Sequence, residues 1–237
     1  MQYTVRAFVE GRDVILDEMC RVFSSMERTA YNLLRDGVGA GATKAALRER
    51  YGVKNARWVQ SVINQARAVM ESQEEGIQCR IEQCGEKARN TREKMKNLQN
   101  PLKIEGCGLK IARYESKAKE LRQQLRERSY PRAVFGSRKL LRQLSIASGE
   151  RRNDLREEWR ETRSNHLFSV GQANQRGNAN TRLSCDASED SFLLEMRNWT
   201  GGDFSLPLRV PEHWSRLLRS VIERAESVKL GGRGELL

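Results

Sequence analysis

Three polar residues in a row offer a hydroxyl group and two cations within a single turn. They are Ser137, Arg138 and Lys139, and they directly follow Gly136. Serine, arginine and lysine side chains commonly bind the phosphate oxygens of nucleic acids, and glycine allows a positive φ or a close backbone approach that a side chain would block. The run therefore predicts a phosphate contact. A plain β-turn with surface charges is the alternative interpretation.

A second group of residues is rich in backbone and side-chain amides. Gly171, Gly177, Asn178 and Asn180 would form a loop with many hydrogen-bond donors and acceptors, which can bind the base edges or 2′-hydroxyls of RNA. Glycine and asparagine also favour tight hairpins, because both adopt left-handed backbone conformations. The segment is thus either an RNA contact or an ordinary turn.

Two further amides, Gln60 and Asn64, are four residues apart on an expected helix, with Arg57 and Arg67 near them. Residues at that spacing share one helical face. Amide side chains can pair with adenine edges while arginines bind phosphates, so this face is a candidate for reading DNA. A solvated helix face fits the same residues equally well.

Enzyme chemistry finds little support in the sequence. There is no phosphate-binding P-loop, nucleophile elbow or H-E-x-x-H helix. His166 and His213 lack an evident partner, and each is interpreted as a surface or packing residue. Asp186, Glu189 and Asp190 cluster, but a solvated polar turn explains them better than a metal site. We therefore expect no catalytic residue, metal or cofactor in this chain.

Charge is the strongest compositional signal. The 237 residues carry 43 Lys and Arg against 31 Asp and Glu, a net charge of +12, and residues 110–165 alone hold 16 against 8. A local excess of this kind is typical of proteins that bind a polyanion, whereas a helical face with paired charges would come close to neutrality.

Other features of the composition bear on location. The five cysteines are irregularly spaced, which favours free thiols in a reducing cytosol over disulfides or a zinc site. No apolar run approaches the roughly 18 residues needed to span a bilayer, and residues 1–10 alternate instead of forming an apolar block. We expect a cytoplasmic protein without a membrane span or signal peptide.

The first elements that would position these side chains follow from the hydrophobic period. Alternation predicts a strand over residues 2–10, and the period then becomes helical. The next expected helices, each with its candidate first residue, run over 13–34 (Asp13 or Arg12), 43–51 (Thr43, ended by Gly52) and 56 to about 77 (Asn55).

A helical hairpin is expected in the middle of the chain. Two charged helices, roughly 74–97 and 109–128, flank a break at Asn100–Pro101 and a turn at Gly106–Gly108. The residues expected to face inward are Ile81, Ala88, Met95, Ile111, Ala118, Leu121 and Leu125.

Short strands dominate the remainder. A strand and turn are expected at 133–136, a helix near 151–163, strands at 192–196 and 204–210, and a last helix from Pro211 to about Lys229. Trp58, Trp159 and Trp214 are expected in the core. We expect a small antiparallel barrel or sheet that includes the N-terminal strand, so that helices interrupt a β domain in an α+β fold.

Four segments resemble, in the same order, TnpB-type proteins encoded by transposons and compact type V CRISPR effectors. Residues 135–140 (FGSRKL) are similar to the F-G-[SG]-K/R-K-L segment of that family. Residues 158–180 resemble its wedge segment, residues 206–211 (LPLRVP) the sheet strand that follows, and residues 55–64 the recognition-lobe helix beside the flanking DNA.

The resemblance implies a wedge domain, a small antiparallel β-barrel, interrupted by a helical recognition lobe with a long hairpin. Residues 1–11 would be the first wedge strand, 12–130 the recognition lobe, and 131–237 the rest of the wedge domain. In the family a RuvC-like nuclease domain with Mg²⁺ comes next, and we expect that domain to be absent from these residues.

The resemblance also implies a function: binding the guide-RNA scaffold and recognising the motif beside the target, as part of an RNA-guided DNA endonuclease. The partners would be guide RNA, double-stranded target DNA and either a C-terminal nuclease chain or a second copy, with no membrane. The predicted nucleic-acid-binding residues are Lys54, Asn55, Arg57, Gln60, Ser61, Asn64, Arg67, Ser137, Arg138, Lys139, Arg160, Arg163, Asn165, Gln172, Asn178 and Asn180.

Two alternatives fit the same residues. One is a nuclease-free repressor that uses a guide RNA to occupy DNA without cutting it. The other is a structural RNA-binding protein with a helical hairpin arm, such as a factor associated with the ribosome or with transfer RNA.

Overall fold

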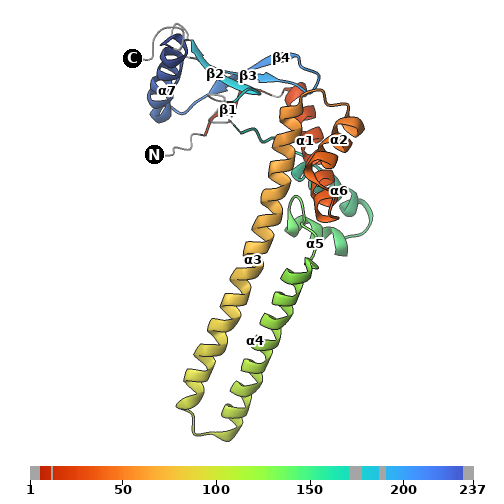
Figure 1. The fold of residues 1–237 in the computed structure, drawn as a ribbon, viewed down its shortest axis with the longest axis vertical. Coiled ribbons are helices and arrows are strands. Elements are labelled where there is room, and N and C mark those ends of the chain that lie inside the picture. Colours follow the sequence, from red (N-terminus) through yellow and green to blue (C-terminus); the bar gives the residue numbers. More distant parts are fainter. Residues whose placement is uncertain (1–5, 12, 171–177, 187–190, 232–237) are drawn as a thin grey trace. The chain divides into compact units, whose positions relative to one another are not determined.

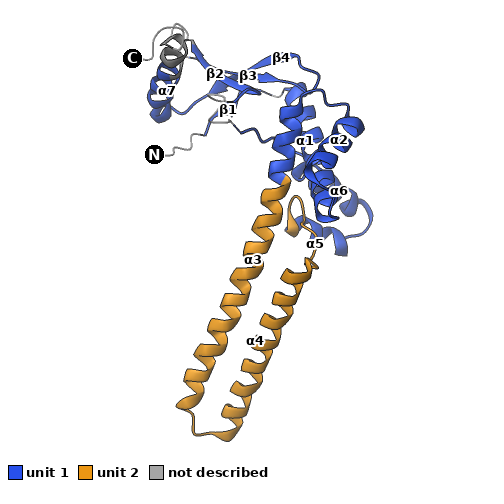
Figure 2. Cartoon of the chain, in the orientation of Figure 1, with its two compact units in different colours: residues 1–65, 139–237 blue, residues 66–138 orange. Residues whose placement is uncertain are grey.

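The computed structural model describes residues 6–11, 13–170, 178–186 and 191–231. Contacts divide the chain into two compact units, residues 1–65 with 139–237 and residues 66–138 (Figure 2). Helices predominate and are joined by a four-stranded antiparallel sheet, so the predicted α+β class is confirmed. The predicted domain limits at residues 11 and 130 do not coincide with these units, and the division into a wedge domain and a recognition lobe stays a prediction.

The sheet belongs to the first unit and consists of β1 (Phe8–Val9), β2 (Thr181–Asp186), β3 (Ser191–Arg197) and β4 (Asp203–Arg209) (Figure 1). Its strand order is β1-β4-β3-β2, with antiparallel neighbours throughout. The expected return of the N-terminal strand to the distant sheet is confirmed, because β1 pairs with β4.

The predicted barrel is wrong for the described residues. β1 and β2 are the two edges of the sheet and do not pair with each other, so the sheet is open. Closure needs a continuous strand ladder, and β1 contributes two residues, while residues 2–5 of the predicted strand lie outside the described ranges. Phe192, Met196 and Leu206 form the buried part of the sheet.

The last helix, α7 (Glu212–Gly231), packs against β2 at this sheet. It begins within one residue of the predicted start at Pro211. The guanidinium of Arg219 lies 5.2 Å from the centre of the Phe192 ring, and its Nη1 donates to the Cys185 sulfur at 3.1 Å.

Three helices build the helical core of the first unit: α1 (Val14–Arg35), α2 (Ala40–Tyr51) and the first turns of α3 (Ala56–Lys96). The predicted start of α1 is confirmed, since Asp13 Oδ1 accepts from the Leu16 N–H at 2.7 Å. Its apolar face and the start of α3 contribute the fully buried residues Met19, Phe23, Met26, Trp58, Val59 and Val62.

Helix α2 begins three residues earlier than predicted. Ala40 is its first residue, whereas the expected cap Thr43 is fully buried inside the helix. A glycine in a helix costs only about 1 kcal/mol relative to alanine, so the burial of Thr43 and Leu47 outweighs the penalty at Gly41. The predicted end at Gly52 is confirmed by its left-handed φ of 63°.

The second unit contains the rest of α3 and α4 (Pro101–Glu127), which form the predicted antiparallel hairpin. Five of the expected inward residues are buried, namely Ile81, Ala88, Ile111, Ala118 and Leu121. Tyr130 packs with Ile77 and Ile81 at the end away from the α3–α4 loop, and its hydroxyl donates to Glu74 at 2.8 Å.

Two boundaries in this hairpin were predicted wrongly. Helix α3 continues unbroken past residue 77, and the expected turn at Gly106–Gly108 lies inside α4. The true start of α4 is set by Asn100, whose Oδ1 accepts from the Leu102 and Lys103 N–H groups. Pro101 suits the first helical position because an N–H there would have no acceptor within the helix, so proline loses no hydrogen bond.

The segment between the hairpin and the sheet agrees only in part with the elements predicted for it. The expected strand at 133–136 is absent: these residues pair with no strand among the described ones, although Gly136 has the positive φ, 88°, that was expected. The chain then forms α5 (Arg138–Ile146), which was not predicted. Helix α6 (Gly149–Thr162) agrees with the helix expected near 151–163.

Two findings complete the description. Among the described residues, no helix combines the length and the apolar character needed to cross a membrane. All five cysteines are free thiols.

Candidate nucleic-acid interface

A groove of about 360 Å³ joins the two amide-rich segments that sequence analysis singled out separately. One wall is the start of α3, and the other is the segment that leads into β2. Both lie in the first compact unit. The lining residues are Lys44, Ala56, Arg57, Gln60, Ser61, Asn64, Val170, Asn178, Ala179 and Asn180.

The α3 wall is organised by Asn55. Its Oδ1 accepts from the Arg57 N–H at 3.0 Å, which confirms the predicted cap. Its Nδ2 donates to Asn180 Oδ1 at 3.1 Å and so ties α3 to the opposite wall. Gln60 Nε2 donates to Asn64 Oδ1 at 2.9 Å, which confirms that these two amides share one face.

The opposite wall is a tight, internally bonded turn. Asn178 Oδ1 accepts from the Asn180 N–H at 3.0 Å, and Asn178 Nδ2 donates to the Ser169 hydroxyl at 2.9 Å. Asn180 itself is only 4% exposed. Neither asparagine has the left-handed φ expected of a tight asparagine hairpin, and Gly171 and Gly177 lie outside the described residues. Asn178 is the more accessible of the two asparagines.

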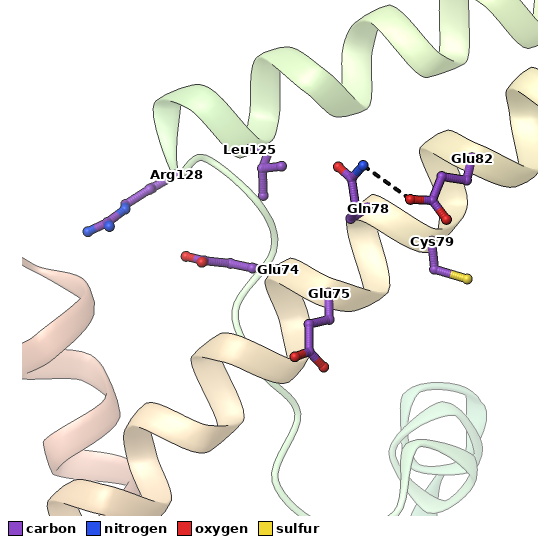
Figure 3. Close-up of a pocket in the computed structure, with 7 residues that line it drawn as sticks. All are labelled: Glu74, Glu75, Gln78, Cys79, Glu82, Leu125 and Arg128. Carbon is purple, nitrogen blue, oxygen red and sulfur yellow. Dashed lines mark hydrogen bonds between the residues drawn. The ribbon is translucent and has the colours of Figure 1, made fainter.

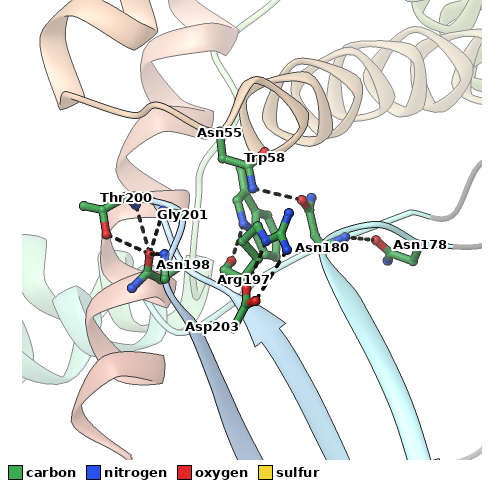
Figure 4. A network of polar contacts seen from close by, with 10 residues as sticks. Asn55, Trp58, Asn178, Asn180, Arg197, Asn198, Thr200, Gly201 and Asp203 are labelled. Atoms are coloured by element: carbon green, nitrogen blue, oxygen red, sulfur yellow. Dashed lines mark hydrogen bonds and ion pairs between the residues drawn. The ribbon is translucent and has the colours of Figure 1, made fainter.

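Residues at the β3–β4 turn contact the start of α3 (Figure 4). Trp58 Nε1 donates to the Arg197 carbonyl at 2.7 Å, and the Trp58 and Trp199 rings lie 5.2 Å apart, edge to face. The Trp199 carbonyl accepts from the Lys54 and Asn55 N–H groups at 3.2 and 3.4 Å. These contacts fix the residues directly before α3, because the Trp199 carbonyl accepts from N–H groups that the helix itself does not pair.

The β3–β4 turn is itself held by one side chain. Asn198 Oδ1 accepts from the N–H groups of Thr200, Gly201 and Gly202, and Gly201 has a positive φ of 99°. A turn closed in this way gives the Trp199 carbonyl a fixed position.

The groove is positive and rich in amides. Lys44 and Arg57 supply its two cations, and no acidic side chain stands among its lining residues in the described part of the chain. Such a lining suits an anionic ligand that also offers polar edges, because cations hold phosphates while amides select among donors and acceptors.

A neighbouring hollow of about 490 Å³ shares Asn178 and Asn180 but is electrostatically different. Arg197 Nε donates to Asp203 at 2.9 Å, and this hydrogen bond lowers the pKa of the Asp203 carboxyl. Arg182 lies 4.0 Å from Glu195. Because its cations already face carboxylates, this hollow is less suited to phosphate than the groove.

Six predicted residues therefore converge on the groove, namely Arg57, Gln60, Ser61, Asn64, Asn178 and Asn180, with Asn55 joining its walls. Lys54 and Arg67 are exposed but do not line it. Ser137, Arg138 and Lys139 are not lining residues either; Arg138 and Lys139 are exposed in the first turn of α5.

The predicted residues at the end of α6 and after it make different contacts. Arg160 Nη1 lies 2.7 Å from Glu157 Oε1 and forms an ion pair with it. The guanidinium carbon of Arg163 lies 4.4 Å from the centre of the Trp159 ring. Burial, followed by repulsion from Arg160, lowers the pKa of Arg163. Asn165 is exposed, and Gln172 falls outside the described residues.

His166 has partners that were not expected from the sequence. Its Nε2 lies 2.7 Å from Glu27 Oε2, and its Nδ1 lies 3.2 Å from the Ser24 hydroxyl. Ser24 is fully buried and Glu27 is 2% exposed. A nucleophile must reach its substrate, and Ser24 is fully buried. We therefore interpret the contacts of His166 with Ser24 and Glu27 as an anchor between the segment after α6 and α1.

Three residues with contacts at the groove or beside it were not predicted from the sequence. Lys44 lines the groove from α2, Trp199 braces α3, and Arg28 Nη1 donates to the Arg163 carbonyl at 2.8 Å. The place of Lys44 at the groove depends on tertiary packing, and the contacts of Trp199 and Arg28 join residues far apart in the chain.

Almost the whole chain matches a known protein family. The family model described as the SSO2105 N-terminal domain covers residues 5–231, and the chain therefore belongs to that family. No curated protein and no solved structure matches the chain.

Proposed function

We propose that this member of the SSO2105 N-terminal domain family binds the scaffold of a guide RNA and helps to recognise the DNA motif beside the target. In this proposal the domain is part of a cytoplasmic, prokaryotic RNA-guided DNA endonuclease of the TnpB-like or type V kind. Cleavage would belong to a Mg²⁺-dependent RuvC-like domain outside these residues. Residues 1–11 and 131–237, which include the sheet, would act as the wedge domain, and the helices within residues 12–130 as the recognition lobe.

One observation carries the proposal: the groove between α3 and the Asn178–Asn180 turn. It gathers residues that were predicted from two separate segments as RNA and DNA contacts. Its lining combines two cations with five amide or hydroxyl side chains and no carboxylate in the described residues. A groove built for an acidic protein partner would need the cations but would have less use for this density of paired amides.

The wider charge supports the same partner. The chain carries a net charge of +12, which favours association with a phosphate backbone and makes that association sensitive to salt. Base pairing with the guide would read the target sequence, and the protein would hold the RNA by shape and charge.

The groove can be tested with a pair of charge-removing substitutions. Lys44→Gln combined with Arg57→Gln should weaken RNA binding at least tenfold. The slope of log affinity against log salt should fall by about one for each phosphate that the variant no longer binds. Binding would be measured by fluorescence anisotropy over a salt series with the RNA that co-purifies with the wild-type chain.

A matched control removes charge elsewhere in the same unit. Arg6→Gln combined with Arg216→Gln takes away two exposed cations that do not line the groove. Its affinity and salt slope should stay close to those of the wild type. Equal losses of affinity in both double variants would show that net charge alone, and not the groove, drives binding.

A further inference from the structure

The α3–α4 hairpin carries its charges in two opposite blocks. Between residues 71 and 86, α3 has five glutamates and one arginine, whereas residues 87–96 have five lysines or arginines and one glutamate. The first part of α4, residues 101–119, adds five cations against two acids. The end of the hairpin near the α3–α4 loop is therefore basic. The part of α3 farther from that loop, residues 71–86, is acidic.

The acidic block lines a surface groove. Glu75, Cys79, Glu82 and Glu86 recur at spacings of four and three residues, which places them on one face of α3. All four are exposed, and we call them the acidic stripe. They border two hollows of about 500 and 410 Å³ that share Cys79 and Glu82. Figure 3 shows the first hollow, to which Leu125 contributes an apolar side chain from α4.

The basic end presents leucines and lysines together. Leu102 and Leu109 are 78% and 69% exposed, and each is followed by an exposed lysine, Lys103 or Lys110. A separation of seven residues places the repeated Leu-Lys pairs on the same side of α4. We call these four residues the basic tip. Their leucines stay in contact with water unless another surface covers them.

We propose that two copies of this chain associate through their hairpins, side by side and antiparallel, so that the basic tip of each copy lies against the acidic stripe of the other. A two-fold axis makes the same pair of contacts twice. If it passes near the junction between Glu86 and Lys87, where the charge changes sign, it sets each acidic block against a basic one.

The lengths are compatible with this axis. At 1.5 Å per residue the acidic block extends about 24 Å from the junction, and the basic part of α3 extends about 15 Å in the other direction before the loop to α4 begins. The basic tip lies at that loop end. It therefore falls opposite the acidic stripe of an antiparallel partner, with the leucines available to the apolar wall at Leu125.

Charge complementarity favours a second copy over nucleic acid on this surface. A phosphate backbone laid along the hairpin would meet the basic block but would be repelled by the five glutamates next to it. A second copy satisfies both blocks at once and also covers the exposed leucines.

The test measures the mass of the full chain, freed of nucleic acid, by sedimentation velocity at low and high salt. The wild type should approach twice its 27.2 kDa at low salt and dissociate at high salt. Two charge-reversed variants are compared with it: Glu75→Lys with Glu82→Lys, and Lys103→Glu with Lys110→Glu. Glu74 is left unchanged because it accepts from Tyr130.

Each variant alone should be monomeric, because its stripe and tip then carry the same sign. An equimolar mixture should form a heterodimer, since the reversed stripe of one variant complements the reversed tip of the other. This recovery also shows that both variants are folded. A monomeric wild type, an unchanged dimer in either variant, or a mixture that stays monomeric would overturn the proposal. A monomer whose tip variant loses RNA affinity would assign the basic tip to nucleic acid instead.

Discussion

At the scale of single residues, the contact between Glu27 and His166 joins α1 to the segment after α6. Glu27 is 2% exposed, and His166 Nε2 is its close partner at 2.7 Å. A carboxylate kept away from water is stable only when a donor compensates for its lost hydration. The contact therefore sets how the segment after α6 attaches to α1.

Replacing His166 should expose this dependence. His166→Ala should lower the free energy of unfolding by about 1–3 kcal/mol, the lower part of the range for a broken buried pair because His166 is itself partly exposed. Denaturant unfolding followed by circular dichroism measures the change. Combining His166→Ala with Glu27→Gln should recover part of the loss, and a combined variant less stable than His166→Ala would contradict the account.

Thiol reactivity gives a second prediction at this scale. Burial and, to a smaller extent, the nearby charge of Asp17 raise the pKa of the Cys20 thiol. A raised pKa leaves less thiolate at neutral pH, and thiolate is the reactive form. Cys20 should therefore react with iodoacetamide more slowly than exposed Cys79 and should accelerate as pH rises towards its raised pKa. Peptide mass spectrometry over a pH series measures both rates, and equal rates at neutral pH would contradict the assignment.

At the scale of elements, predicted caps were right where a side chain bonds to the start of the helix and wrong at Thr43, which packing buries inside α2. Asp13 and Asn55 were both found from their side-chain chemistry. The turn expected at Gly106–Gly108 failed because a glycine costs a helix only about 1 kcal/mol, which the packing of Ile111 and Ala118 on α3 outweighs. The barrel failed for a related reason, since closure depends on strand lengths and pairing far apart in the chain.

The cap of α4 can be tested separately from its packing. Asn100→Ala removes the acceptor of the Leu102 and Lys103 N–H groups and should cost about 1 kcal/mol of local stability. Hydrogen exchange of the first turn of α4 should then become about fivefold faster, since that is the factor that 1 kcal/mol gives. Asn97→Ala, three residues before the cap, serves as the control. Unchanged exchange in the Asn100 variant would show that packing alone holds this turn.

At the scale of the whole molecule, the groove illustrates what a sequence can and cannot reveal. The residue types and the i,i+4 spacing of Gln60 and Asn64 could be read directly. Their meeting with Asn178 and Asn180 could not, because it depends on the bond from Asn55 to Asn180 and on the support that Trp199 gives to α3. Lys44 was missed for the same reason, as its place follows from tertiary packing.

The central claim is that this domain holds a guide RNA, and the most direct measurement is to sequence the RNA that stays bound when the chain is purified from its source at moderate salt. The account predicts one dominant structured RNA that ends in a variable stretch, with its retention reduced in the Lys44→Gln, Arg57→Gln variant. Bulk ribosomal or transfer RNA, or no retained RNA at all, would contradict it.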